Sequence, residues 1–192
     1  TAPQRVFDVL KVLKNLILAH RKIFQSFHQK QKTVKISIAH NMAFFERANK
    51  NSFLDRFSAF LCHYFINDYF LERIKNYLDF IGLNYYFHQK VKTFKLSENE
   101  NKLVSDFGWE IYPEGIYHLL KHLDKKYHLP ILITENGVAD KEDRLRKDFI
   151  KNHLFWIHRA IEEGVNVFGY LHWSLLDNIE WDFGSNLRFG LL

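Results

Sequence analysis

Strand-like and helix-like segments alternate along this chain, and the alternation constrains its fold more than any other feature. Apolar residues recur with helical spacing in three segments, 6–27, 113–127 and 148–163. Four short runs of β-branched and apolar residues predict strands, at 34–39, 77–86, 130–134 and 165–174. The aromatic-rich stretch 51–74 is expected to be helical in part, and the polar stretch 91–106 to be a loop or hairpin. This order predicts an α/β fold with parallel strands and helical crossovers.

Two arrangements fit this pattern, a doubly wound sheet and part of a barrel. No glycine-rich phosphate loop follows any predicted strand, which disfavours the nucleotide-binding form of the doubly wound sheet. Polar and aromatic residues gather instead at the carboxyl ends of the last three strands, at 84–86, 135–137 and 173–181. A parallel barrel carries its active site at this end of its strands. These residues are therefore the candidates for a functional site.

The net charge of +5 invites comparison with nucleic-acid-binding proteins. The lysines are scattered over predicted helices and loops, however, and no known nucleic-acid motif occurs. No run approaches the roughly 18 apolar residues that a membrane helix needs. Cys62 is the single cysteine, so an intrachain disulfide cannot form, which fits a reducing compartment. We expect a cytoplasmic protein that binds neither nucleic acid nor membrane.

Glu135 follows an apolar strand at once, in the run Ile-Thr-Glu-Asn-Gly. A carboxylate at a strand tip can project into a pocket while the strand holds its position. Glu135 can equally cap the next turn, since Asn136 and Gly137 are typical turn residues. The local sequence by itself favours the turn.

The stretch 173–181 combines aromatic and polar side chains in a way that suits sugar binding. Sugars present an apolar face, on which the rings of Trp173 and Trp181 could pack, and a rim of hydroxyls, from which Glu180 could accept hydrogen bonds. An aromatic core segment is the alternative, but each of its polar residues would need a buried partner. Tyr86 could bond a neighbouring carboxylate, and both Tyr86 and Asn84 could instead be ordinary residues of the strand rim.

Four motifs together closely resemble glycoside hydrolase family 1, the β-glucosidase family. They lie at 79–86, 133–137, 173–181 and 188–191, and their order and spacing also match the family. The resemblance is tight from about residue 77 to the end, and the first predicted helix resembles the one after the family's fourth strand. It implies a partial (β/α)8 TIM barrel made of about the last four strand–helix units. Residues 1–192 would then be the C-terminal half of the catalytic domain, with the N-terminal half absent.

The resemblance also implies a role for each candidate residue. Glu135 would be the catalytic nucleophile, and Tyr86 would donate a hydrogen bond that orients it. Substrate-binding roles would fall to Asn84, Trp173, Glu180 and Trp181. The family uses no metal and no organic cofactor, so none is expected here.

The implied reaction is retaining hydrolysis of terminal non-reducing β-D-glycosyl residues in β-glycosides or oligosaccharides. It needs two carboxyls roughly 5–5.5 Å apart. The family's acid/base Glu lies in a Thr-x-Asn-Glu-Pro run at the end of its fourth strand, and no Asn-Glu-Pro occurs in this sequence. We therefore expect the chain to be inactive alone and to need the missing N-terminal half-barrel as a partner. The alternative is a non-catalytic, degenerate half-barrel that binds sugar or has no activity.

Two departures from the family pattern concern the sugar site. Ile179 stands where the family usually has Phe before the Glu-Trp pair. Ser185 follows Gly184, where the family usually has Tyr. The second departure leaves the sugar preference open.

Overall fold

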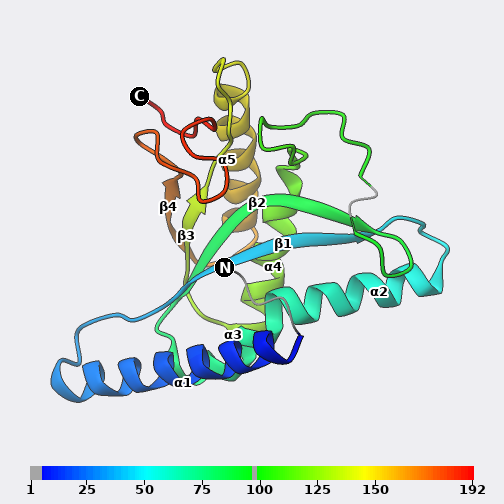
Figure 1. Ribbon diagram of the computed structural model, residues 1–192. Helices are drawn as coiled ribbons and strands as arrows, with labels where there is room; N and C mark the ends of the chain where they lie inside the picture. The colour runs from blue at the N-terminus through cyan, green and yellow to red at the C-terminus, as the bar shows by residue number, and fades with distance from the viewer. Residues whose placement is uncertain (1–5, 97–98) are drawn as a thin grey trace.

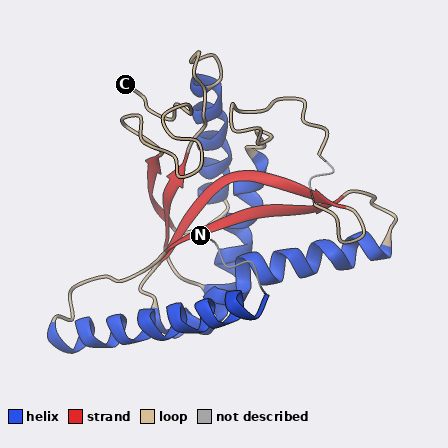
Figure 2. Cartoon of the chain, viewed as in Figure 1, coloured by secondary structure: helices blue, strands red, loops and turns tan. Residues whose placement is uncertain are grey.

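The computed structural model describes residues 6–96 and 99–192 as a parallel sheet with connecting helices (Figure 1 and Figure 2). The strands are β1 (Ala39–Arg47), β2 (Ile81–Val91), β3 (Ile131–Asn136) and β4 (Val167–His172). The α-helices are α1 (Val6–Lys30), α2 (Phe53–His63), α3 (Tyr69–Ile74), α4 (Glu114–Tyr127) and α5 (Arg146–Glu162). A π-helical turn, Tyr64–Asp68, joins α2 to α3, and a 3-10 turn, Lys75–Tyr77, follows α3.

The strands form one sheet in the order β1-β2-β3-β4, and every neighbouring pair is parallel. Helix α4 connects β2 to β3 and α5 connects β3 to β4; the two helices pack against each other behind the sheet (Figure 1). Strands that run in chain order with helical crossovers are the repeating unit of a (β/α)8 barrel. The predicted α/β fold, with about four strand–helix units of a barrel, is confirmed.

The core lies between the sheet and its helices. Its fully buried side chains include Ile81, Leu83, Ile131 and Ile133 from the strands, and Ile116, Leu119, Leu120 and Leu123 from α4. The α4 residues recur at the three- and four-residue spacing that predicted a helix over 113–127. Burial of one such side chain stabilises the fold by about 1.5–3 kcal/mol. The core therefore fixes how the strands lie against α4.

The predicted helices are confirmed with small changes at their ends. Helix α4 begins after Pro113 and ends at Tyr127, and the next residue, His128, caps it with a left-handed backbone at a φ of 53°. Helix α5 ends before Gly164, whose φ of 93° suits glycine better than any other residue. The aromatic stretch 51–74 is helical as α2, the π turn and α3.

The first two strands were predicted too early in the sequence. The segment 34–38 leads into β1 without belonging to the sheet, and Asp79 holds it. The Ile36 amide donates to Asp79 Oδ2 (2.7 Å), and the Asp79 amide donates to the Ile36 carbonyl (2.9 Å). Strand β1 runs on past His40 and Asn41, whose polar side chains hid the strand in the sequence pattern. Strand β2 likewise begins only after the 3-10 turn.

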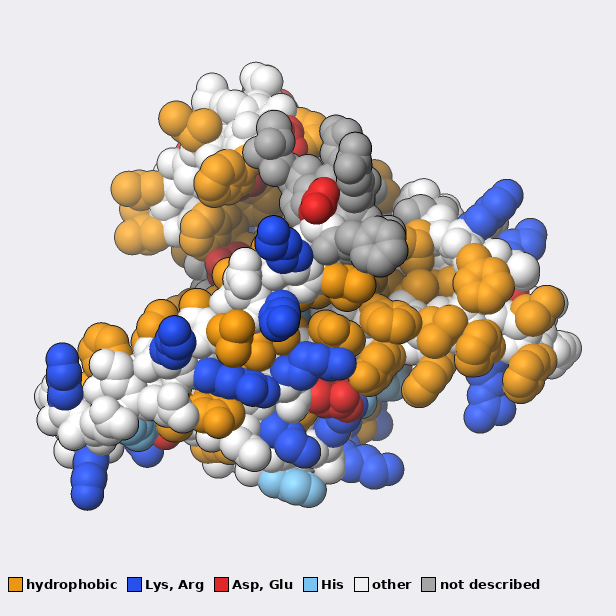
Figure 3. Space-filling view, turned by 60° about the horizontal axis from the view of Figure 1, so that its bottom comes forward, with side chains coloured by type: hydrophobic (Ala, Val, Ile, Leu, Met, Phe, Trp, Pro, Cys, Tyr) orange, Lys and Arg blue, Asp and Glu red, His pale blue; other side chains and the backbone are white. Residues whose placement is uncertain are grey.

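The sheet is open, with β1 and β4 at its edges. On β4, the side chains of Phe168 and Leu171 are more than half exposed. Figure 3 shows a second group of exposed apolar side chains along α2, whereas basic side chains are spread over the surface around α1. Among the helices that the structure describes, none has the length and apolar character needed to cross a bilayer.

Candidate active site

Glu135 is the second-last residue of β3, at the carboxyl end of the sheet. Ile131 and Ile133 on the same strand are fully buried in the core. They share one face of the strand because side chains alternate along it. The pairing of β3 with β4 loses its regular register between Ile133 and Asn136. Irregularities of this kind redirect side chains. Glu135 is half-buried there.

Tyr86 on β2 donates a hydrogen bond of 2.7 Å from its hydroxyl to Oε2 of Glu135. Burial, and after it this hydrogen bond, raises the pKa of Tyr86. The hydroxyl therefore stays protonated and remains a donor at neutral pH. The carboxylate of Glu135 is thus oriented by a neighbouring strand.

A cavity of about 260 Å³ lies in front of this pair. It is lined by Tyr86, Trp109, Glu135, Trp173, Asn178, Glu180, Trp181 and Phe189. Five of the six predicted site residues therefore share one cavity. Asn84 is the exception: it is buried, and its Oδ1 accepts a hydrogen bond of 2.5 Å from Thr134 Oγ1.

The segment that carries Glu180 and Trp181 forms an open rim of this cavity. The side-chain amide of Asn178 donates to Oε1 of Glu180 (2.8 Å), and the Glu180 backbone pairs with Gly184. The Trp181 side chain is fully exposed, and Ile179 is 79% exposed. The alternative of an aromatic core segment over 173–181 is therefore wrong.

Asn136 joins the three strands that surround the site. Its side chain donates to the Tyr85 carbonyl (2.7 Å) and accepts from the Tyr170 hydroxyl (3.0 Å), while its carbonyl accepts from the Trp173 amide (3.0 Å). The residue is fully buried, so it acts as a strand connector and not as an exposed turn residue. At Gly137, a Cβ atom would lie 1.8 Å from the Trp173 carbonyl oxygen, so only glycine fits.

The sequence model described as glycosyl hydrolase family 1 matches residues 62–192. This chain belongs to glycosyl hydrolase family 1. A β-galactosidase of Sulfolobus acidocaldarius is 51% identical over 92 residues, which are 48% of this chain and 19% of that protein. β-Glucosidase A of Acetivibrio thermocellus is 49% identical over 98 residues, which are 46% of this chain and 22% of that protein. The family resemblance seen in the sequence motifs is confirmed.

Solved structures extend the family match over almost the whole fold. A β-glycosidase from Pyrococcus horikoshii superposes with a TM-score of 0.89 at 33% identity, covering 98% of this chain and 49% of that chain. The chain thus spans about half the length of this solved relative, and its alignments cover about a fifth of the curated relatives.

Three residues that line the cavity were not predicted as site residues: Trp109, Asn178 and Phe189. Trp109 lies in the connection between β2 and α4, and its ring stacks on Phe107 with centroids 3.8 Å apart. Phe189 approaches the Tyr86 ring edge-on at 6.3 Å. The position of Trp109 after a strand could have marked it as a site residue, because the connections that follow barrel strands surround the active site.

Arg146, the first residue of α5, is a buried cation behind this site. Its guanidinium donates to three backbone carbonyls, of Val138 (2.9 Å), Phe189 (3.2 Å) and Asp140 (2.8 Å). Its Nε also donates to Asp143 Oδ1 (2.9 Å). The side chain therefore joins the loop after β3 to the segment that brings Phe189 into the cavity.

The site offers two carboxylates in unlike surroundings. Glu135 is oriented by a tyrosine at the floor of the cavity, whereas Glu180 lies on the exposed rim beside Trp181. A fixed carboxylate suits attack on a carbon centre. A rim carboxylate next to an aromatic ring suits binding of sugar hydroxyls.

Proposed function

We propose that Glu135 is the nucleophile of a retaining β-glycosidase that releases terminal non-reducing β-D-glycosyl residues from β-glycosides or oligosaccharides. The observation that carries the proposal is the 2.7 Å hydrogen bond from Tyr86 to Glu135, in a cavity that is also lined by three tryptophans. The hydrogen bond holds one carboxylate oxygen, so the other is left to attack. Membership of family 1 supports the same assignment.

In this reaction Glu135 forms a bond to the anomeric carbon while the bond to the leaving oxygen breaks. A second carboxyl group gives its proton to that oxygen and later takes one from the attacking water. Trp173 and Trp181 pack on the apolar faces of the sugar, and Glu180 accepts hydrogen bonds from its hydroxyls. Asn84 would act through Thr134, because it holds that neighbour of Glu135.

The acid/base carboxyl group, in our proposal, comes from an N-terminal half-barrel that carries the Thr-x-Asn-Glu-Pro run. Two features of this chain support such a partner. Within residues 6–96 and 99–192, no strand pairs with the outer edge of β1 or of β4, and a barrel of this class closes with eight strands. An apolar groove lies beside the β4 edge, and Leu154, Ile161 and Phe168 are among its lining residues. We therefore predict that the chain alone has negligible activity.

A fusion tests this proposal. The part of the Pyrococcus horikoshii β-glycosidase that this chain leaves unmatched is joined to residues 1–192, and hydrolysis of an aryl β-D-glucoside is followed. Activity is expected in the fusion and not in the isolated chain. Glu135→Gln should abolish it, whereas Glu142→Gln, at an exposed position of the next loop, should not.

A control for assembly is the Pyrococcus protein divided at the same point and rejoined. A folded fusion with no activity beside an active control would reject the hydrolase proposal. It would support the second candidate, a half-barrel that binds sugar without cleaving it. That candidate rests on the fact that Trp173, Glu180 and Trp181 all belong to this chain. Calorimetric titration of glucose would then detect binding without turnover.

We also propose a cytoplasmic location, because the chain carries a single cysteine, Cys62, which is free. Fractionation of the producing cells tests this, and recovery from the extracellular fraction would refute it.

A further inference from the structure

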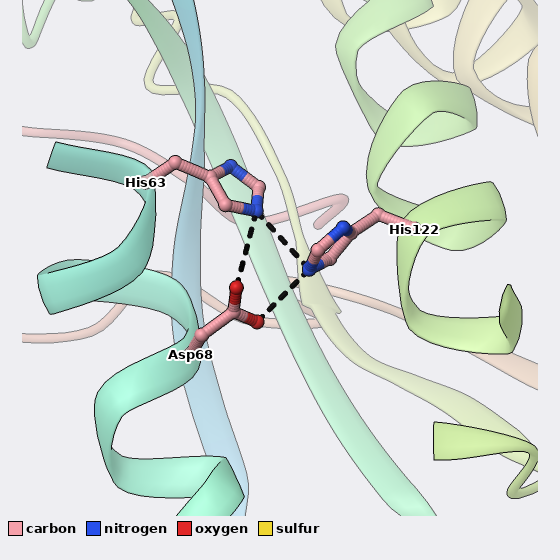
Figure 4. Close-up of side chains that lie close together, drawn as sticks. All are labelled: His63, Asp68 and His122. Carbon is pink, nitrogen blue, oxygen red and sulfur yellow. Dashed lines mark hydrogen bonds and ion pairs between the residues drawn. The ribbon is translucent and has the colours of Figure 1, made fainter. Parts of the chain in front are cut away.

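Three potential metal ligands converge at a place that the glycosidase proposal does not use (Figure 4). His63 is the last residue of α2, Asp68 ends the π turn, and His122 lies on the facing helix α4. Their ligand atoms all lie within 4.8 Å of one another. The lining of the Glu135 cavity consists of other residues.

The separations of these atoms fit a shared ion. His63 Nε2 and His122 Nε2 are 3.1 Å apart, His122 Nε2 lies 2.9 Å from Asp68 Oδ1, and His63 Nε2 lies 3.6 Å from Asp68 Oδ2. An ion with tetrahedral bonds of about 2.0–2.1 Å to its ligands separates them by roughly 3.3 Å. Two imidazoles and a carboxylate are a ligand set that Zn²⁺ accepts.

Without an ion, the hydrogen bonds of this cluster leave two N–H groups pointing at each other. The carboxylate of Asp68 only accepts hydrogen bonds, so the contact to His122 requires a hydrogen on His122 Nε2. The Asn67 amide is fixed by two hydrogen bonds to the Ala43 backbone, which turns an N–H toward His63 Nδ1 at 3.1 Å. His63 then carries its hydrogen on Nε2, and two N–H groups face each other across 3.1 Å.

An ion between the nitrogens removes that conflict and creates a smaller one. Coordination through Nε2 moves the His63 hydrogen to Nδ1, so the contact with Asn67 must lengthen. The site has three protein ligands, one fewer than a structural zinc site, and binding also lengthens the contact with Asn67. The expected dissociation constant is therefore on the order of micromolar.

The charges of the cluster are those that metal binding needs. Burial opposes ionisation of Asp68, but hydrogen bonds from His122 and Lys126 outweigh it and lower the pKa of Asp68 to about 2. Burial, followed by the nearness of His122, lowers the pKa of His63 to about 4. At neutral pH Asp68 is an anion and His63 is neutral, as ligands must be. Lys126 contacts Oδ2 of Asp68, while Oδ1 faces His122.

The cluster is also open to solvent on one side. The side chain of Asp68 is 4% exposed, whereas those of His63 and His122 are 23% and 29% exposed. The Tyr127 hydroxyl donates to Asp68 Oδ1 (3.0 Å) and holds it toward the imidazoles. An ion can thus enter from water and keep a water molecule as its fourth ligand.

We propose that His63, Asp68 and His122 bind a divalent transition-metal ion, with Zn²⁺ preferred, which fastens α2 and the π turn to α4. The role is structural. The ion connects the aromatic helical segment that follows β1 with the helix that packs behind β2 and β3. Bound Zn²⁺ therefore raises the unfolding temperature.

The test titrates Co²⁺ into residues 1–192 and follows its visible absorption, with Zn²⁺ binding measured by calorimetry. Wild type should bind one ion and gain about 5–10 °C in unfolding temperature at 100 times the dissociation constant. His122→Ala should weaken binding by at least roughly 100-fold, the upper end of the loss for a group that only supports a ligand. His158→Ala is the matched control, an exposed histidine on α5, and should bind as wild type does.

Cys62 precedes His63, so its thiolate must be tested as the ligand. Cys62→Ser should bind Co²⁺ as wild type does. Neither protein should show the near-ultraviolet sulfur-to-cobalt band that a thiolate ligand gives. If circular dichroism shows that His122→Ala is unfolded, His63→Gln serves in its place. No Co²⁺ absorption in wild type at 100 μM ion would overturn the proposal. Equal binding by wild type, His122→Ala and His63→Gln would overturn it as well. Loss of binding in Cys62→Ser would do the same.

Discussion

Replacement of Arg146 by alanine tests how the loops around the cavity are held. The guanidinium donates to the carbonyls of Val138, Asp140 and Phe189, and its side chain is 7% exposed. The carbonyls of Asp140 and Phe189 keep the amides of Asp143 and Ser174 as donors, whereas the carbonyl of Val138 loses its donor. Alanine therefore removes three hydrogen bonds that a buried cation donates. Each such loss costs about 1–3 kcal/mol. Water that enters the vacated space would replace some of these hydrogen bonds, which places the total near the lower end of its range. We expect the free energy of unfolding to fall by at least about 3 kcal/mol.

The assay is urea unfolding at 25 °C, followed by tryptophan fluorescence. With a slope of about 2 kcal/mol/M, the midpoint of Arg146→Ala should fall by about 1.5 M. Arg146→Lys should fall between wild type and alanine, because lysine keeps the charge but not the planar array of donors. The matched control is Arg144→Ala at an exposed position two residues away, with an expected change within about 0.5 kcal/mol. Equal midpoints for Arg146→Ala and Arg144→Ala would refute the reasoning.

Three further predictions concern the cavity and the core. Gly137→Ala brings a Cβ within 1.8 Å of the Trp173 carbonyl oxygen and should change the near-ultraviolet circular dichroism of the tryptophans. Burial lowers the pKa of His153 to about 4, so the unfolded chain binds its proton first as pH falls. The contribution of His153 to stability is then complete above about pH 6.5 and is lost toward pH 4, about 3 kcal/mol in total. The urea midpoints of wild type and His153→Gln should therefore fall with different slopes over this range. Tyr86→Phe in the active fusion removes the hydrogen bond to Glu135 and should lower kcat/KM by about 10- to 100-fold.

Each of these predictions has a result that contradicts it. An unchanged tryptophan spectrum in Gly137→Ala would mean that the backbone approach is looser than described. The same pH slope in wild type and His153→Gln would assign the acid sensitivity to other groups. Full activity of Tyr86→Phe would show that Glu135 is oriented without the hydroxyl.

The sequence predicted elements well where one periodic pattern continued through them. Helix α4 was predicted because Ile116, Leu119, Leu120 and Leu123 repeat on one face, and all four are buried. Strand β1 was misplaced because His40 and Asn41 interrupt its apolar run. His40 bonds the Asn67 carbonyl (3.0 Å), a contact with a residue 27 positions away. Local patterns contain no information on such partners.

The site residues likewise differ in whether the local sequence could identify them. Glu135 and the tryptophans of 173–181 were found because motifs mark them, and the structure brings them to one cavity. Asn84 was assigned to the cavity by its motif, but the register of β2 and β3 turns it to Thr134. Arg146 escaped notice because an arginine at the start of a helix is expected in solvent. Its burial depends on carbonyls from the preceding loop and on the carbonyl of Phe189, which lies 43 residues away.

Rescue by azide tests whether Glu135 attacks the anomeric carbon. Glu135→Gly in the active fusion should lose hydrolysis, and azide should restore consumption of an aryl β-D-glucoside from the vacated side. The expected product is an α-glucosyl azide, because azide enters from the face that the carboxylate occupied. A variant that still hydrolyses the substrate without azide, or that gives a β-glucosyl azide, would contradict the assignment.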